Sequence, residues 1–164
     1  MLIGKIISGG QTGVDRGALE AALEFGTPYG GMIPKGRLAE DGQVPLVFDK
    51  LVEATRKDYL YRTEQNVINS DATLILSRTG RELKGGTKRT VEFCKKHNKP
   101  YFIDNPDEPN ETDRGAEVLY WIESELGGDD LVINVAGSRE SKDVGVQAST
   151  KRYVKWLLIE TDDE

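Results

Sequence analysis

The stretch LIGKIISGGQTGVDRGALEAALEFG, residues 2–26, decides the fold. Its first seven residues are an apolar run that ends in two glycines, which is typical of a buried strand followed by a turn. Apolar residues then recur at the spacing of one helix face, at Val14, Ala18, Ala21, Ala22 and Phe25. Gly26 and Pro28 predict the end of this helix, because glycine favours a helix C-cap and proline lacks the N–H group. The stretch therefore predicts a strand, a glycine turn and a helix.

The same alternation continues along the chain. Apolar runs predict further strands at 31–33, 72–77, 101–104 and 131–136. Helical spacing predicts helices at 60–68 and 87–97, a helix capped by Thr112 or Asp113 and closed by Gly127, and a last helix that buries Tyr153 to Leu158. Strands that alternate with helices imply crossovers between parallel strands. We expect one α/β domain over residues 1–164, a three-layer sandwich in which helices cover both faces of a parallel sheet of about five strands, with a solvated acidic tail at 160–164.

Composition excludes several classes of protein. The chain has 164 residues, of which 28 are acidic and 22 basic, and a formal net charge of -6. One cysteine, Cys94, and one histidine, His97, exclude a disulfide scaffold and a zinc site built from cysteine and histidine, and we expect no metal site. Apolar runs are far shorter than the ~20 residues that span a bilayer, and Lys5 interrupts the N-terminal run. We therefore expect a cytoplasmic protein without membrane contact, and the net negative charge argues against a nucleic-acid partner.

Glycine and positive charge gather where the predicted strands end. Ten of the 18 glycines lie within the first 42 residues, more than an even spread would place there. Four turns combine glycine with cations: SGGQTGVDR at 8–16, PKGRLAEDG at 34–42, SRTGRELKGGTKRT at 77–90 and AGSRESK at 136–142. The third holds Arg78, Arg81, Lys84, Lys88 and Arg89 against Glu82 alone.

These turns predict a site for an anion. Glycines let the backbone approach a ligand, and the N–H groups at the start of a helix carry partial positive charge. Ligands of parallel sheets bind at the carboxyl ends of the strands, where the four turns converge. The ligand class this indicates is a phosphorylated small molecule. Tight turns without a ligand and solvated charged loops are the alternatives.

Catalytic residues are less evident. Asp15 and Glu92 lie on the helices that follow the first and third turns, so a carboxylate could face the pocket. No set of nucleophile, base and orienting residue can be read from the chain.

Five segments, taken in order, carry a resemblance to a known family: SGGQTGVDRGALEAAL, GGMIPKGRLAEDG, RTEQNVINSDATLI, GGTKRTVEF and INVAGSRESK. Together they closely resemble the molybdenum cofactor carrier family, over roughly residues 3 to 158. That family is similar to other SLOG proteins, which are Rossmann-like and include the lysine-decarboxylase-like phosphoribohydrolases and the YpsA-like proteins. The resemblance implies a nucleotide-like or pterin phosphate ligand across the strand ends, in a homo-oligomer.

The enzymatic branch of these proteins has the motif P-G-G-x-G-T-x-x-E, which falls here on residues 84–92. Gly85, Gly86 and Glu92 match, whereas Lys84, Lys88 and Arg89 replace the proline, the third glycine and the threonine. The replacements argue against phosphoribohydrolase activity, and the added cations suit a strongly anionic ligand.

The leading hypothesis is thus a binding or carrier protein for molybdenum cofactor, or for a similar phosphate-bearing nucleotide or pterin, with no catalytic cofactor. The residues expected to contact the ligand are Gly9, Gly10, Gln11, Thr12, Gly13, Asp15, Arg16, Lys35, Arg37, Lys84, Gly85, Gly86, Thr87, Arg89 and Arg139. The alternatives are a nucleotide N-glycosidase, in which Glu92 assists and Arg89 positions the phosphate, and a nucleotide sensor.

Overall fold

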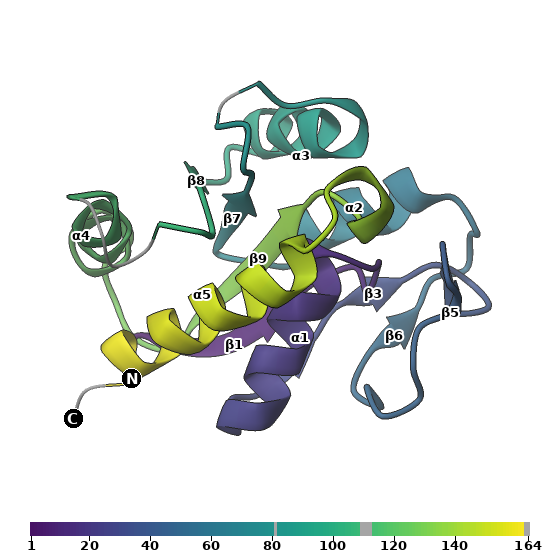
Figure 1. The fold of residues 1–164 in the computed structure, drawn as a ribbon, viewed down its shortest axis with the longest axis horizontal. Helices are drawn as coiled ribbons and strands as arrows, with labels where there is room; N and C mark the ends of the chain where they lie inside the picture. Colours follow the sequence, from purple (N-terminus) through teal and green to yellow (C-terminus); the bar gives the residue numbers. More distant parts are fainter. Residues whose placement is uncertain (81, 109–112, 163–164) are drawn as a thin grey trace.

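The chain forms one sheet of five parallel strands with helices on both faces (Figure 1), as predicted. The computed structural model describes residues 1–80, 82–108 and 113–162. Its sheet strands are β1 (Ile3–Ile7), β2 (Tyr29–Gly30), β7 (Ala72–Leu76), β8 (Tyr101–Asp104) and β9 (Leu131–Gly137). The predicted cation Arg81, the cap candidate Thr112 and the last two residues of the acidic tail fall outside this description, whereas the other cap candidate, Asp113, is the first residue of a helix.

The last strand lies in the middle of the sheet. The spatial order is β2-β1-β9-β7-β8, so β9 pairs with both β1 and β7. If the strands are counted from β9, through the last helix and on into β1, the order reads 3-2-1-4-5, the order of a doubly wound Rossmann sheet. The start of the chain lies beside the end of the last helix, Val146–Thr161: the Leu2 N–H donates to the Thr161 carbonyl at 3.1 Å, and Figure 1 shows the N-terminus next to the end of that helix. The fold is thus a Rossmann sheet whose starting point has moved.

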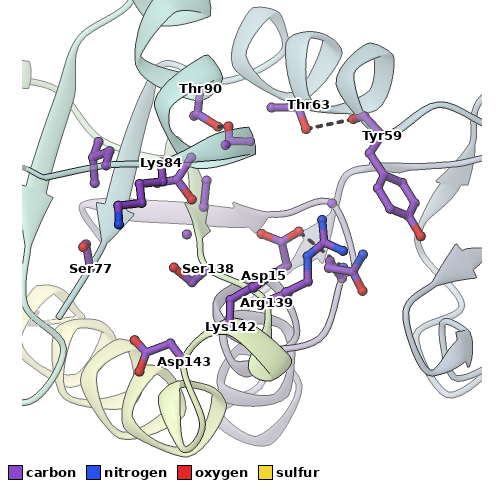
Figure 2. A pocket seen from close by; sticks show the side chains of 18 of the residues that line it. Asp15, Tyr59, Thr63, Ser77, Lys84, Thr90, Ser138, Arg139, Lys142 and Asp143 are labelled. Carbon is purple, nitrogen blue, oxygen red and sulfur yellow. Dashed lines mark hydrogen bonds between the residues drawn. The ribbon is translucent and has the colours of Figure 1, made fainter. Parts of the chain in front are cut away.

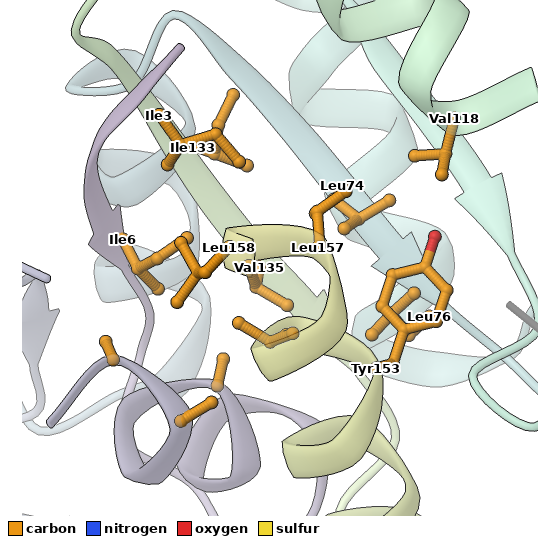
Figure 3. Packing of buried hydrophobic residues seen from close by; sticks show 14 of the residues in the cluster. Ile3, Ile6, Leu74, Leu76, Val118, Ile133, Val135, Tyr153, Leu157 and Leu158 are labelled. Atoms are coloured by element: carbon orange, nitrogen blue, oxygen red, sulfur yellow. The ribbon is translucent and has the colours of Figure 1, made fainter. Parts of the chain in front are cut away.

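The helices form two layers. On one face lie α1 (Val14–Phe25), α5 (Val146–Thr161) and α4 (Asp113–Tyr120), which continues as a π-helix, η1 (Trp121–Leu126). On the other lie α2 (Tyr59–Ile68) and α3 (Gly85–Lys96), around a small cluster that includes Cys94. Figure 3 shows Tyr153, Leu157 and Leu158 of α5 directed at the strands. Among the described helices, none has the length and apolar character that crossing a membrane requires.

Two predicted boundaries differ from the structure by more than one residue. The fifth sheet strand is Tyr29–Gly30 instead of 31–33, because the chain turns away at Gly31, where φ is +122° and a side chain would clash with Ser8. Met32–Ile33 (β3) pairs instead with Val52–Glu53 (β6) in a separate two-stranded sheet. Helix α3 begins at Gly85, two residues before the predicted start.

A small hairpin extends from the sheet on the side of β2. It consists of β4 (Leu38–Ala39) and β5 (Gly42–Gln43), which pair antiparallel. Ala39 of the hairpin lies in a small apolar cluster with Leu19 of α1, Ile33 of β3, Val44 and Phe48.

Helices α1 and α5 pack closely because α1 has a glycine at the contact. A Cβ at Gly17 would clash with the Gln147 carbonyl and lie 3.0 Å from Thr150 Cβ. This approach brings the start of α5 beside the start of α1, and both starts lie next to the strand ends.

We expect Gly17→Ala to lower the free energy of unfolding. Replacing glycine by alanine inside a helix ordinarily stabilises it by about 0.5–1 kcal/mol, whereas overpacking costs about 1–3 kcal/mol. Urea unfolding measures the difference, and Gly86→Ala in α3, where nothing lies within 4 Å of the added Cβ, is the control. A stabilised Gly17→Ala variant would show that the two helices can separate without cost.

Candidate functional site

A cavity of about 580 Å³ opens at the carboxyl ends of β1, β7 and β9 (Figure 2). Its other walls come from α2, from the start of α3 and from the 3-10 helix Glu140–Lys142 (η2). The cavity lies where the strand order reverses, between β9 and β7, which is where doubly wound sheets bind their ligands. Its volume is within the range of about 300–1,000 Å³ that small-molecule sites occupy.

Part of the first glycine turn, residues 8–16, lines the cavity. Most of the backbone N–H groups of this turn already donate hydrogen bonds within the protein. The N–H groups of Gln11, Thr12 and Gly13 donate to Asp15 Oδ2 at 3.3 Å, to Gln11 Oε1 at 3.0 Å and to Gln147 Oε1 at 3.0 Å. At Gly13, φ is +83° and a Cβ would clash with the Ser138 carbonyl. The glycine there lets the turns after β1 and β9 touch.

Two charged side chains lie buried at the floor of the cavity. Arg62 of α2 donates to the Gly9 carbonyl and to Thr63 Oγ1, and its Nη1 lies 3.9 Å from Asp15 Oδ2. Burial raises the pKa of Asp15, against the opposing effects of Arg62 and of the Gln11 N–H. Burial also lowers the pKa of Arg62, and the nearby Arg139 lowers it further, although Asp15 opposes both. Asp15 is therefore committed to an internal pair.

The start of α3 has unused donors. The first N–H groups of a helix have no acceptor within it. Those of Gly85, Gly86 and Thr87 have none among the described residues either, and all three residues line the cavity. These N–H groups carry the positive end of the helix dipole.

Three cations that line the cavity make no ion pair with a described residue. They are Lys84, Arg139 and Lys142. Arg78 differs from them, since it bonds to Asp143 Oδ1, to the Val144 carbonyl and to Ser149 Oγ, and so fastens β7 to the start of α5. The described lining holds five cations against three carboxylates, in a chain of net charge -6.

The structure brings eight of the predicted ligand contacts to the cavity: Gly9, Gln11, Asp15, Lys84, Gly85, Gly86, Thr87 and Arg139. The other seven, Gly10, Thr12, Gly13, Arg16, Lys35, Arg37 and Arg89, do not line it.

Local contacts explain where the outlying charged residues lie. Arg16 pairs with Asp41, and Arg37 donates to the carbonyls of the loop it belongs to. Arg89 pairs with Glu92 at 3.1 Å on the exposed side of α3, where each side chain is about half exposed, and neither lines the cavity. No residue of the second turn, 34–42, lines the cavity.

Sequence reasoning missed the face of α2 that lines the site. Its members are Tyr59, Arg62, Thr63 and Asn66. They recur at the i, i+3, i+4 and i+7 spacing of a helix face, which was a usable signal, but polar side chains at that spacing are also typical of a solvated face. Asn134 and Ser138, at the end of β9, were missed as well. Among the described residues, no group of three or more His, Cys, Asp or Glu side chains could hold a metal ion.

Comparison with known proteins agrees with this geometry. The profile of the Circularly permutated YpsA SLOG family matches residues 6–158. The chain belongs to this family. The family's description as circularly permuted agrees with the strand order, in which β9, the last strand along the chain, lies at the centre of the sheet.

A solved relative shares the whole fold. The crystal structure of a "Putative molybdenum carrier protein" from Syntrophus aciditrophicus SB is 41% identical, covers 96% of both chains and has a TM-score of 0.85. No curated protein matches the chain.

In this member of the YpsA family, the tip of the β4–β5 hairpin fastens the first and fourth turns together. Glu40 accepts hydrogen bonds from the Thr12 hydroxyl, from Ser141 Oγ at 2.5 Å and from the Ser141 N–H at 3.1 Å. Although burial acts to raise it, the bonds from Ser141 and Thr12 hold the pKa of Glu40 below its usual value. Glu40 thereby holds the segment that carries Arg139.

We expect Glu40→Gln to lower the free energy of unfolding by about 1 kcal/mol at neutral pH, because it weakens hydrogen bonds to a charged acceptor. A lowered carboxyl pKa contributes stability above its unfolded value near 4.5, and that contribution is lost as the pH falls through the folded value. The two proteins should therefore converge in acid. Urea unfolding at pH 7 and pH 3 measures this, with the exposed Glu123→Gln as control, and a difference independent of pH would contradict it.

Proposed function

We propose that this protein binds and carries a phosphate-bearing nucleotide or pterin in the cavity at the strand ends, with molybdenum cofactor as the leading candidate. The observation that carries the proposal is the set of unused positive groups there. Lys84, Arg139 and Lys142 make no ion pair with a described residue, and the N–H groups of residues 85–87 have no described acceptor.

A bound phosphate would accept hydrogen bonds from these N–H groups and offset the charge of these cations, which no described residue does. Helix N-termini bind phosphate through free N–H groups and the helix dipole. Lysine and arginine add charge-assisted hydrogen bonds to phosphate oxygens. Figure 2 shows Lys84, Ser138 and Lys142 around the same part of the cavity.

The volume of the cavity indicates that the ligand is larger than phosphate. About 580 Å³ is room for a phosphate together with an organic ring system. Molybdenum cofactor combines a pterin ring with a phosphate, and the related crystal structure bears the name of a molybdenum carrier. In this proposal the metal is part of the cargo, so it needs no ligand set from the chain.

Holding the ligand intact fits the carboxylates better than hydrolysing it does. Glu92, the residue that would assist N-glycosidase chemistry, pairs with Arg89 outside the cavity. Asp15, inside it, is paired with Arg62 and accepts the Gln11 N–H. Carrier function needs neither carboxylate to touch the ligand.

Native mass spectrometry of the protein purified from a molybdenum-replete host tests the carrier function. We expect a fraction of the protein to carry a mass that matches a phosphorylated pterin or nucleotide, with pterin fluorescence in the first case. A Lys84→Gln/Arg139→Gln double variant should lose that mass. Recovery of only the ligand-free wild-type chain would count against the proposal.

Titration with inorganic pyrophosphate tests the anion site separately. Lys84→Gln removes one charge-assisted hydrogen bond, so we expect an affinity about tenfold weaker. Lys35→Gln is the matched control, since Lys35 is exposed and does not line the cavity. Equal affinities for the wild type and Lys84→Gln would place the anion elsewhere.

A further inference from the structure

The cavity has two chemically different ends. Figure 2 shows Lys84 and Ser77 on one side and Tyr59 on the other, with Asp15 and Arg139 between them. The first end has unpaired positive charge and free N–H groups. The second has the one aromatic side chain among the described lining residues, and Leu60 beside it is 39% exposed.

Two guanidinium groups already lie over the Tyr59 ring. Arg62 Cζ is 5.2 Å from the ring centroid and Arg139 Cζ is 5.9 Å from it. Arg62 is fixed by the Gly9 carbonyl and Thr63 Oγ1. The guanidinium of Arg139 makes no hydrogen bond and no ion pair with a described residue, so the side chain can move aside without breaking one.

A buried donor in the same cavity has no acceptor among the described residues. Gln11 is 6% exposed, and its Oε1 accepts from the N–H groups of Thr12 and Glu40, which fixes the orientation of the amide. Its Nε2 has no hydrogen-bond partner in the described part of the chain. Buried polar groups are rarely unsatisfied, so a missing partner there calls for an explanation. A ring carbonyl or ring nitrogen of a ligand would provide the acceptor.

We propose that the ligand lies across the cavity, with its phosphate at the start of α3 and a flat heteroaromatic ring that bears an acceptor against Tyr59 and Arg139. This inference rests on the proposed function and adds an orientation and a ligand class to it. Tyrosine rings and arginine guanidinium planes both stack on planar rings. Tyr59 and Arg139 therefore set the preference for purine-type or pterin-type phosphates over sugar phosphates.

Calorimetric titration with two probes tests the orientation. GMP has a flat ring that bears acceptors, whereas ribose 5-phosphate has no flat ring. In the wild type we expect GMP to bind more tightly. Tyr59→Leu removes one stacking surface, so GMP affinity should fall about tenfold while ribose 5-phosphate affinity stays unchanged. Tyr59→Phe keeps the ring and should keep GMP affinity. Leucine is a strong helix former, which favours a folded variant.

The control is Tyr120→Leu, a tyrosine of α4 that is 62% exposed and does not line the cavity. It should change neither affinity. If Tyr59→Leu weakens both probes equally, or neither, the ring subsite is overturned while the anion site stands. If neither probe binds the wild type, both this inference and the nucleotide part of the proposed function fail, and retention of a pterin in native mass spectrometry then decides the function on its own.

Discussion

The close approach of the turn after β1 to the turn after β9 is the contact on which the site depends. The Val14 N–H donates to the Ser138 carbonyl at 3.1 Å, and the absence of a side chain at Gly13 is what permits it. On the other side of β9, a Cβ at Gly137 would clash with the Leu76 carbonyl. Three strand ends are thereby held within contact of one another, and the cavity is the space above them.

Several acidic side chains near this contact have hydrogen-bond or ion-pair partners within the protein. Acidic side chains near the turns are occupied by internal partners: Asp15 by Arg62, Asp41 by Arg16, Glu40 by Thr12 and Ser141, and Asp143 by Arg78. Three of the cations that make no ion pair with a described residue, Lys84, Arg139 and Lys142, line the cavity. The described lining therefore carries an excess of positive charge, in a chain whose total charge is negative.

Much of the fold followed from local pattern. Apolar runs and helical spacing located the sheet strands at 3–7, 72–76, 101–104 and 131–137 and the long helices, because burial on both faces of a parallel sheet leaves a strong signal. The short strand predicted at 31–33 forms as β3, but outside the main sheet, and the edge strand β2 was not predicted. The end of β2 depends on a contact between Gly31 and Ser8 that local pattern does not encode. The turns after β1, β7 and β9 were placed at one edge by the rule that parallel strands end together.

By itself the sequence determined the α/β class, the glycine turns and the excess of cations after the strands. Only the tertiary structure decided which of those groups are free. The first turn looked like an anion cradle, yet its donors are taken by Asp15, Gln11 and Gln147, the last of them more than 130 residues away. Arg62 and Tyr59 were not among the predicted site residues, yet they line the site. Whether a donor is available depends on what lies opposite it in space, and the order of residues along the chain does not specify that.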